Sequence, residues 1–302
     1  MFYSRILIMS VLLTSLIFAM ETPIFADDYI VTQITKNIFH DTDPQLNNNG
    51  HVVWSGGYLD DNGLRGEIFL YNGSSIVRLS DNINSDTQPY LNDSGDVVWR
   101  GWDGSDYEIF LYDGSSPIQL THNSVNDHDY KINDHGDVVW VEGYYMDDGS
   151  RPKLFLYNGI NTIMLSSYSG EHEHDINNSG YVVWPGYDGS DNEIFLYDGY
   201  DIIQLTHNSY DDHDPKISDN GYVVWSAYDG SGEEIYLYDG SDIIQLTNNS
   251  YGDHDPKINK NGYVVWSEEL NEDDVPPPKL FLYDGVKTIQ LKRQQLRGLE
   301  WV

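Results

Sequence analysis

Apolar and polar residues follow one another in blocks along this chain, and the blocks repeat. The tripeptide Val-Val-Trp occurs six times, with successive tryptophans 45, 41, 44, 41 and 41 residues apart. Each repeat holds four short runs of β-branched and aromatic residues, separated by Asn-Gly and Asp-Gly pairs that are typical of tight turns. The pattern predicts a four-stranded unit that recurs six times. Its tryptophans are Trp54, Trp99, Trp140, Trp184, Trp225 and Trp266.

The second and third runs of each repeat are apolar at successive rather than alternate positions. Such strands are covered on both faces of their sheet. Residues 27–302 show no helical period. We therefore predict an all-β protein, a six-bladed β-propeller of four-stranded antiparallel blades in a single domain over residues 27–302. The predicted blades span approximately residues 41–80, 86–121, 127–166, 171–206, 212–247 and 253–291.

The order of motifs within a repeat resembles a known family. In the fifth repeat, Asp212-His213-Asp214-Pro215 leads through Ser218-Asp219-Asn220-Gly221 to Val223-Val224-Trp225, then to Tyr238-Asp239-Gly240 and Gln245-Leu246-Thr247. This sequence resembles the WD-like repeat of TolB-type β-propellers, and the resemblance covers residues 29–291. It implies the propeller fold. It leaves function open, because such propellers serve both as binding platforms and as gating domains of peptidases.

The first residues after the leader resemble a fourth strand. Gln33-Ile34-Thr35 matches Gln204-Leu205-Thr206, so we expect a strand over residues 29–35 that could close the ring. The sixth repeat nevertheless has its own fourth run, Thr288-Ile289-Gln290-Leu291. Six blades are therefore our prediction, with an incomplete seventh as the alternative.

Residues 1–26 have the composition of a secretory signal peptide, because a basic Arg5 precedes an apolar stretch over residues 6–20. That stretch is shorter than the roughly 20 residues that span a bilayer. We expect a secreted or periplasmic monomer without membrane insertion after cleavage. The formal net charge of −33 argues against nucleic-acid binding. The chain has no cysteine, so it forms no disulfide.

Acidic residues recur just before the first strand of each repeat. In antiparallel blades, the connection into this strand shares a face with the hairpin between the second and third strands, and that hairpin varies in length. We predict that ligand binding involves this face. The candidate residues are Asp41, Asp43, Asp86, Asp127, His128, Asp129, Glu171, His172, Asp212, His213, Asp214, Asp253, His254 and Asp255.

Two interpretations of these acids stay open. Each carboxylate could accept backbone hydrogen bonds and fix the turn into the first strand, which we favour. Alternatively, the ring of acids could bind a divalent cation, with calcium as one candidate. Spaced carboxylates also occur in three hairpins, but these lack the full calcium-loop series, so we interpret them as Asp-Gly turns. The hairpins are Asp103-Gly104-Ser105-Asp106-Tyr107-Glu108, Asp188-Gly189-Ser190-Asp191-Asn192-Glu193 and Asp229-Gly230-Ser231-Gly232-Glu233-Glu234.

Common catalytic motifs are absent from the sequence: it has no Gly-x-Ser-x-Gly elbow, no His-Glu-x-x-His and no cysteine nucleophile. We therefore predict a binding module whose partner is a protein or a glycan. The alternative is a propeller enzyme, a polysaccharide lyase or hydrolase or a peptidase-type enzyme, that uses Asp and His on the same face. Equivalent blades would favour binding, and one asymmetric cluster would favour an enzyme.

Overall fold

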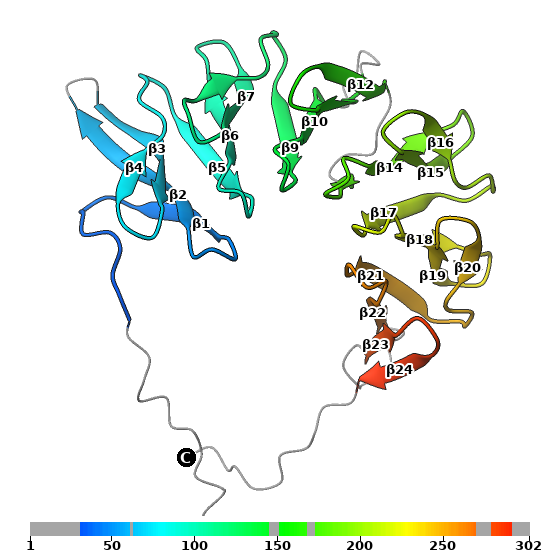
Figure 1. The fold of residues 1–302 in the computed structure, drawn as a ribbon. Coiled ribbons are helices and arrows are strands. Elements are labelled where there is room, and N and C mark those ends of the chain that lie inside the picture. Colours follow the sequence, from blue (N-terminus) through cyan, green and yellow to red (C-terminus); the bar gives the residue numbers. More distant parts are fainter. Residues whose placement is uncertain (1–30, 61–62, 145–150, 168–172, 270–278, 292–302) are drawn as a thin grey trace, which may run out of the picture. The chain divides into compact units, whose positions relative to one another are not determined.

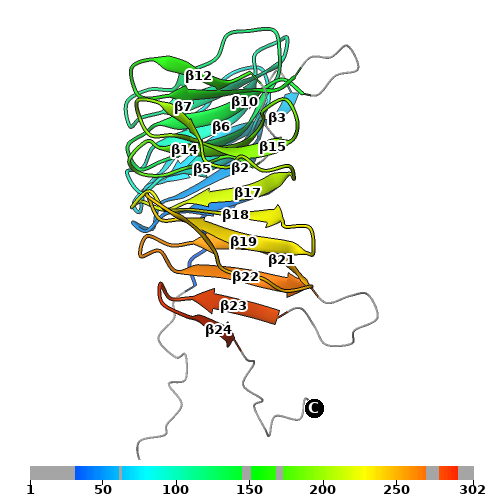
Figure 2. The ribbon, with the colours of Figure 1, turned by 90° about the vertical axis from the view of Figure 1, so that its right-hand side faces the viewer.

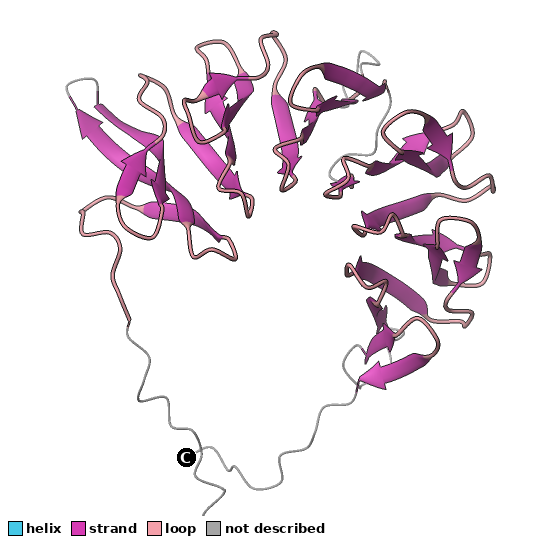
Figure 3. Cartoon of the chain, in the orientation of Figure 1, coloured by secondary structure: helices cyan, strands magenta, loops and turns pink. Residues whose placement is uncertain are grey.

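The structure is a computed structural model that describes residues 31–60, 63–144, 151–167, 173–269 and 279–291. Within these ranges the regular elements are strands, and no helix is present (Figure 3). The described part of the chain accordingly contains no helix that is long and apolar enough to cross a membrane. The strands form six four-stranded antiparallel sheets (Figure 1), which confirms the predicted all-β fold with six blades.

Each sheet consists of four consecutive strands. The first three sheets contain β1 (Asp41–Leu46), β2 (Val52–Asp60), β3 (Gly63–Tyr71), β4 (Ile76–Arg78), β5 (Asp86–Leu91), β6 (Val97–Trp102), β7 (Tyr107–Tyr112), β8 (Ile118–Gln119), β9 (Asp127–Ile132), β10 (Val138–Glu142), β11 (Lys153–Tyr157) and β12 (Thr162–Ser166). The other three contain β13 (Asp175–Ile176), β14 (Val182–Tyr187), β15 (Asn192–Tyr197), β16 (Ile202–Gln204), β17 (Asp212–Ile217), β18 (Val223–Tyr228), β19 (Glu233–Tyr238), β20 (Ile243–Gln245), β21 (Gly252–Ile258), β22 (Val264–Glu269), β23 (Lys279–Tyr283) and β24 (Thr288–Leu291).

The Val-Val-Trp tripeptide packs against two neighbouring sheets at once. In the second sheet, Val97 and Trp99 belong to a core cluster with Ile68 of the first sheet. Val98 points the other way and packs with Trp140 of the third sheet. Equivalent clusters join each later pair of sheets, which follow one another in chain order (Figure 2). Successive apolar positions are thus explained by two separate cores, one on each face.

Each tryptophan of this tripeptide also stacks on an aromatic residue of the next strand in its own sheet. Trp99 lies 5.7 Å from Phe110 between ring centroids, at an interplanar angle of 14°. Trp225 and Tyr236 are related in the same way, at 5.8 Å and 16°. The tryptophans are buried, and their aromatic partners are partly buried, so the stacked pairs belong to the packing of the sheets.

The first strand of five sheets carries a bulge at a fixed position. The third residue of the Asp-Thr-Asp-Pro segment in the first sheet, and its equivalent in four other sheets, has a left-handed backbone. The register with the second strand shifts at the same point. Aspartate tolerates this conformation better than most residues. The residues and their φ angles are Asp43 (51°), Gln88 (55°), Asp129 (48°), Asp214 (52°) and Asp255 (53°).

Strand pairing gathers two kinds of connection on one surface. Asp212, at the start of β17, pairs with Ala227 near the end of β18, and Tyr228 then pairs with Glu233 across the hairpin. The connection into each first strand therefore lies beside the hairpin between the second and third strands. We call this surface the loop face. It is the face on which the sequence places the candidate residues.

The strand predicted over residues 29–35 does not form in its described part. Residues 31–38 contain no strand and belong to a unit separate from the one that begins at Phe39 and holds the sheets. Strand β24 supplies the fourth strand of the sixth sheet, as its own run predicts. How the ring closes stays a prediction.

We expect Gln88→Gly to raise the free energy of unfolding by about 1 kcal/mol. A residue with a Cβ atom pays roughly 1–2 kcal/mol for a left-handed backbone, whereas glycine adopts it freely. Urea unfolding followed by fluorescence measures the change.

The neighbour Thr87 provides the control, because its backbone is not left-handed. Thr87→Gly should destabilise the protein by roughly 0.5–1 kcal/mol, the usual cost of glycine within a strand. Equal losses in the two variants would contradict the left-handed assignment at Gln88.

Candidate functional site

Buried acids pair across the contacts between sheets. In four sheets, a glutamate on the third strand lies near the aspartate that begins the next sheet. Both members of each pair are buried, with exposures of 0% for Glu67, Asp86, Glu108 and Asp127. We call these four contacts the acid contacts. Their members are Glu67 with Asp86, Glu108 with Asp127, Glu193 with Asp212, and Glu234 with Asp253.

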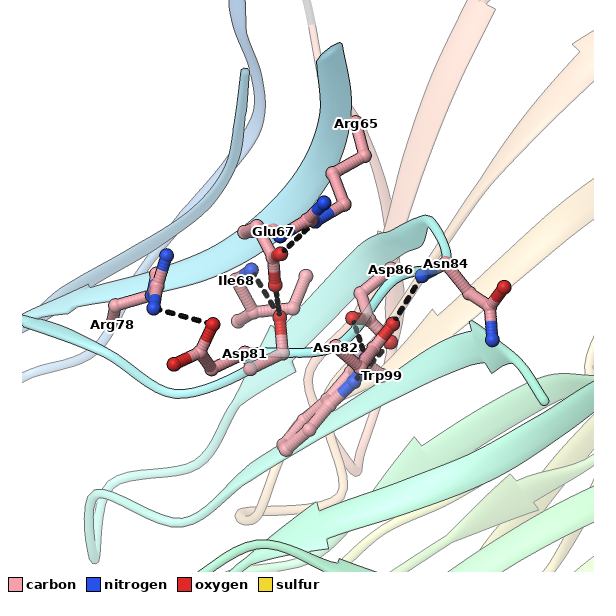
Figure 4. A network of polar contacts seen from close by, with 10 residues as sticks. Arg65, Glu67, Ile68, Arg78, Asp81, Asn82, Asn84, Asp86 and Trp99 are labelled. Atoms are coloured by element: carbon pink, nitrogen blue, oxygen red, sulfur yellow. Dashed lines mark hydrogen bonds and ion pairs between the residues drawn. The ribbon is translucent and has the colours of Figure 1, made fainter. Parts of the chain in front are cut away.

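The first acid contact is hydrogen-bonded at all four carboxylate oxygens (Figure 4). Arg65 Nε and Ser80 Oγ donate to Glu67, at 2.9 and 2.6 Å. Asn82 Nδ2 and Trp99 Nε1 donate to the two oxygens of Asp86, at 2.6 and 3.1 Å. The aspartate thus fixes the connection into β5 and the indole of the buried core together.

The other acid contacts keep the same donors in part. Asn123, Asn208 and Asn249 each donate a side-chain hydrogen bond of 2.8 to 3.0 Å to the aspartate four residues later. Trp266 Nε1 donates to Asp253 Oδ1 at 3.0 Å. The contacts of Asp86 and Asp253 with Asn and Trp side chains favour the structural interpretation of this acidic column.

Burial also changes the protonation of these aspartates. It raises the pKa of Asp86 to about 6, although hydrogen bonds from Ser80, Asn82 and Trp99 lower it. The pKa values of Asp127 and Asp212 are raised as well, first by burial and then by the neighbouring Glu108 and Glu193. Taking a carboxylate out of water disfavours its charged form. These buried aspartates are therefore poorly placed to bind a ligand that approaches the loop face from solvent.

The remaining candidates lie in different surroundings. Asp41, Asp43 and Asp255 are exposed, and Asp129 and Asp214 are partly exposed at the bulges. Glu171 and His172 lie outside the described residues. His128 is 4% exposed, with Nδ1 2.5 Å from Asp129 Oδ2 and Nε2 2.7 Å from the Gly143 carbonyl oxygen. His128 therefore holds its own loop and is not presented to a ligand.

The structure brings His213 and His254 together through an acid that we did not select from the sequence. Glu233 contacts His213 Nε2 with one oxygen and lies 2.8 Å from His254 Nδ1 with the other. Asp214 and Glu233 raise the pKa of His213 to about 10 through hydrogen bonds. This imidazole is therefore protonated at neutral pH, so it cannot accept a proton as a general base. Glu233 stands where β7 and β15 have Tyr107 and Asn192, and its charge was the only signal in the sequence.

Two pockets open on the loop face. One, of about 610 Å³, lies between the second and third sheets and includes Trp102, Tyr144, Arg151 and Lys153 in its lining. The other, of about 380 Å³, lies between the fourth and fifth sheets and includes Tyr210, Tyr228 and Tyr236. Both volumes fall within the range of small-ligand sites, roughly 300–1,000 Å³. Neither pocket is centred on the predicted acidic ring.

Comparison with known proteins agrees with the fold. No family model matches the chain, and no curated protein matches it in sequence. A puromycin-hydrolysing peptidase from Mycobacterium tuberculosis is similar in structure, with a TM-score of 0.51 and 13% identity over 85% of this chain and 46% of that one. A putative TolB from Agrobacterium tumefaciens gives 0.46 and 16% over 72% and 83% of the two chains. The β-propeller domain of the Trilobed protease from Pyrococcus furiosus gives 0.43 and 13% over 86% and 98%.

These identities show the fold alone. TolB proteins are among the similar structures, as the predicted resemblance implies. The chain spans about half the length of the peptidase that it matches with the higher score, so that protein's activity does not transfer with the fold.

We expect the free energy of unfolding to fall as the pH rises from about 4 to about 6. The pKa of Asp86 is higher in the folded chain, about 6, than its ordinary value of 3.8. The folded state therefore binds more protons than the unfolded state in this window, and its stabilisation is complete below pH 4 and lost as the pH passes 6. Urea unfolding at half-unit pH steps measures the slope.

Asp86→Asn should flatten this slope, because an amide does not titrate in that range. Asp239→Asn is the control, since Asp239 is exposed and hydrogen bonds from its own turn lower its pKa. Its effect should appear only below pH 4. Part of the slope should remain, because the pKa values of Asp127 and Asp212 are raised as well. A slope between pH 4 and 6 in Asp86→Asn as steep as in the parent chain would contradict the assignment.

Proposed function

We propose that the chain is a binding module and that it takes a protein or peptide partner in the 610 Å³ pocket of the loop face. The observation that carries this proposal is the composition of the pocket lining. Trp102, Tyr144 and Arg151 all contribute to it. These are the residue types that dominate binding energy at protein interfaces, because they bury a large area and also offer polar groups.

Charges beside the aromatic residues support a partner of mixed polarity. Lys153 Nζ lies 2.5 Å from Glu142 Oε1, so this pair at the pocket wall is already neutralised. Asp106 also lines the pocket. A partner that places an apolar side chain beside the aromatic rings of Trp102 and Tyr144 fits this arrangement. A glycan partner is the other outcome that the experiment below distinguishes.

The alternative of an Asp and His enzyme finds less support on this face. Its asymmetric cluster is His213, Glu233 and His254, and the raised pKa keeps His213 protonated at neutral pH. Acid–base catalysis works best with a pKa near the working pH. A secreted or periplasmic location belongs to this proposal as well, supported by the leader-like sequence of residues 1–26.

We expect Trp102→Ala to weaken binding by roughly tenfold or more, as truncation of a central aromatic contact usually does. A random peptide library displayed on phage and a glycan array, both probed with the purified chain, identify the ligand. Isothermal titration calorimetry with the selected ligand then measures the affinity.

Tyr187→Ala is the matched control. Tyr187 ends β14 just as Trp102 ends β6, but it does not line this pocket. Its affinity should stay within twofold of the parent chain. If the screens select glycans and no peptides, the partner is a glycan and the proposed partner class is wrong. Equal losses of affinity in Trp102→Ala and Tyr187→Ala would contradict the pocket as the binding site.

A further inference from the structure

Three of the acid contacts contain buried carboxylate oxygens without a hydrogen-bond partner, and in the contact of Glu234 with Asp253 only Glu234 Oε2 is of this kind. Glu108 and Asp127 are both 0% exposed, and Glu108 Oε2 and Asp127 Oδ1 lack partners. Glu193 Oε2 and Asp212 Oδ1 lack partners in the same way. A buried carboxylate without a donor or a cation is costly. Either a proton held between the two carboxyl groups, which the raised pKa values of Asp127 and Asp212 favour, or a cation beside them offsets this cost.

The first acid contact shows what kind of group completes the arrangement. There, the guanidinium of Arg65 lies 2.9 Å from Glu67 Oε1 and is buried with it. Arg65 stands two residues before the glutamate of its strand. The second and fourth sheets have Asp106 and Asp191 at this same position, two residues before Glu108 and Glu193. An additional negative charge thus replaces the positive charge that Arg65 supplies.

The acids of these two hairpins converge. Asp103, Asp106 and Glu108 each place a carboxylate oxygen within 4.8 Å of the others, and so do Asp188, Asp191 and Glu193. Asp106 is 6% exposed, and its Oδ2 also lacks a partner. Two oxygens that bind one calcium ion at about 2.4 Å lie at most about 4.8 Å apart. The spacing of both groups therefore suits a single shared cation.

We propose that each of these hairpins binds one calcium ion, held by Asp103, Asp106 and Glu108 in the second sheet and by Asp188, Asp191 and Glu193 in the fourth. The ion takes the place that the Arg65 guanidinium has in the first sheet. Each ion neutralises the acid contact with the following sheet, so calcium stabilises the array of sheets.

The donor set favours calcium over other divalent ions. All three side chains of each group offer carboxylate oxygens, the hard ligands that calcium and magnesium prefer to the nitrogen and sulfur ligands of transition metals. Magnesium keeps several water molecules in a strict octahedron, whereas calcium accepts six to eight oxygens in flexible geometry. The buried side of each group, formed by Glu108 or Glu193, leaves little room for a hydrated ion.

The first cation group shares Asp106 with the proposed binding pocket, whereas no residue of the second group lines that pocket. Loss of calcium binding at Asp191 therefore tests the cation sites without disturbing the pocket.

In the experiment, calcium chloride alone is titrated into EDTA-treated, desalted protein at 0.15 M KCl, and isothermal titration calorimetry measures the binding. We expect two equivalents per chain, and the thermal unfolding midpoint should rise by roughly 5 °C or more at saturating calcium. Asp106→Asn and Asp191→Asn should each remove one equivalent, and the double variant should remove both. In EDTA the unfolding midpoint of the double variant should be no lower than that of the parent chain, because the variant has fewer carboxylates that repel one another.

Two further variants sharpen the test. Asp229→Asn is the matched control, because Asp229 occupies the equivalent turn of the fifth sheet, where Gly232 stands in place of Asp106. It should still bind two equivalents. Asp106→Arg places an arginine where the first sheet has Arg65. This variant should bind one equivalent, and its unfolding midpoint in EDTA should be higher than that of Asp106→Asn.

Three outcomes would overturn the proposal. One is an unfolding midpoint that calcium and EDTA leave unchanged. Another is two equivalents retained by the Asp106→Asn, Asp191→Asn double variant, which would place the ions on other acids. The third is an Asp106→Arg variant no more stable in EDTA than Asp106→Asn.

Discussion

The second to fifth sheets of this protein depend on a neighbour at each side to bury both of their faces. A four-stranded sheet with apolar residues at successive positions loses stability when either face is left in water, since each large apolar side chain contributes about 1.5–3 kcal/mol on burial. Val97 and Val98 show how one strand divides its residues between two cores. The stability of any sheet is therefore shared with the sheets beside it, as in repeat proteins generally.

This mutual burial decides what the acidic residues can do. Asp86 begins its sheet at the point where the preceding sheet covers it, so the carboxylate faces Asn82 and Trp99 in place of solvent. Acids only two residues further along, at the bulges, are partly or fully exposed. The carboxylates behind the net charge of −33 thus have very different surroundings. Aromatic residues contribute to the lining of both pockets on the loop face, together with some acids.

The sequence predicts the fold well because the signals for each strand and turn occur in all six repeats. Val-Val-Trp and the Asn-Gly and Asp-Gly pairs act locally, and local patterns can be read from sequence. The acidic column was also found, but its burial depends on a neighbouring sheet, which no local pattern reports. The cluster around Glu233 was missed because it joins two repeats at one place only. Asp106 and Asp191 were noted in their hairpins, yet their importance depends on Arg65, which occupies their position in a different repeat.

Each acid contact is built from two halves that lie in different repeats: a glutamate on the third strand of one sheet and the aspartate that begins the next sheet. The third and sixth repeats have Lys153 and Lys279 at the position of the glutamate. The second and fifth repeats carry both halves, so a duplicated copy of either one would supply the glutamate and the aspartate of a new contact without any new residue. The repeats differ in their hairpins, where the position of Arg65 is occupied by Asp106, Asp191 and Gly232 in other sheets. The residue at this one position sets the charge beside each acid contact.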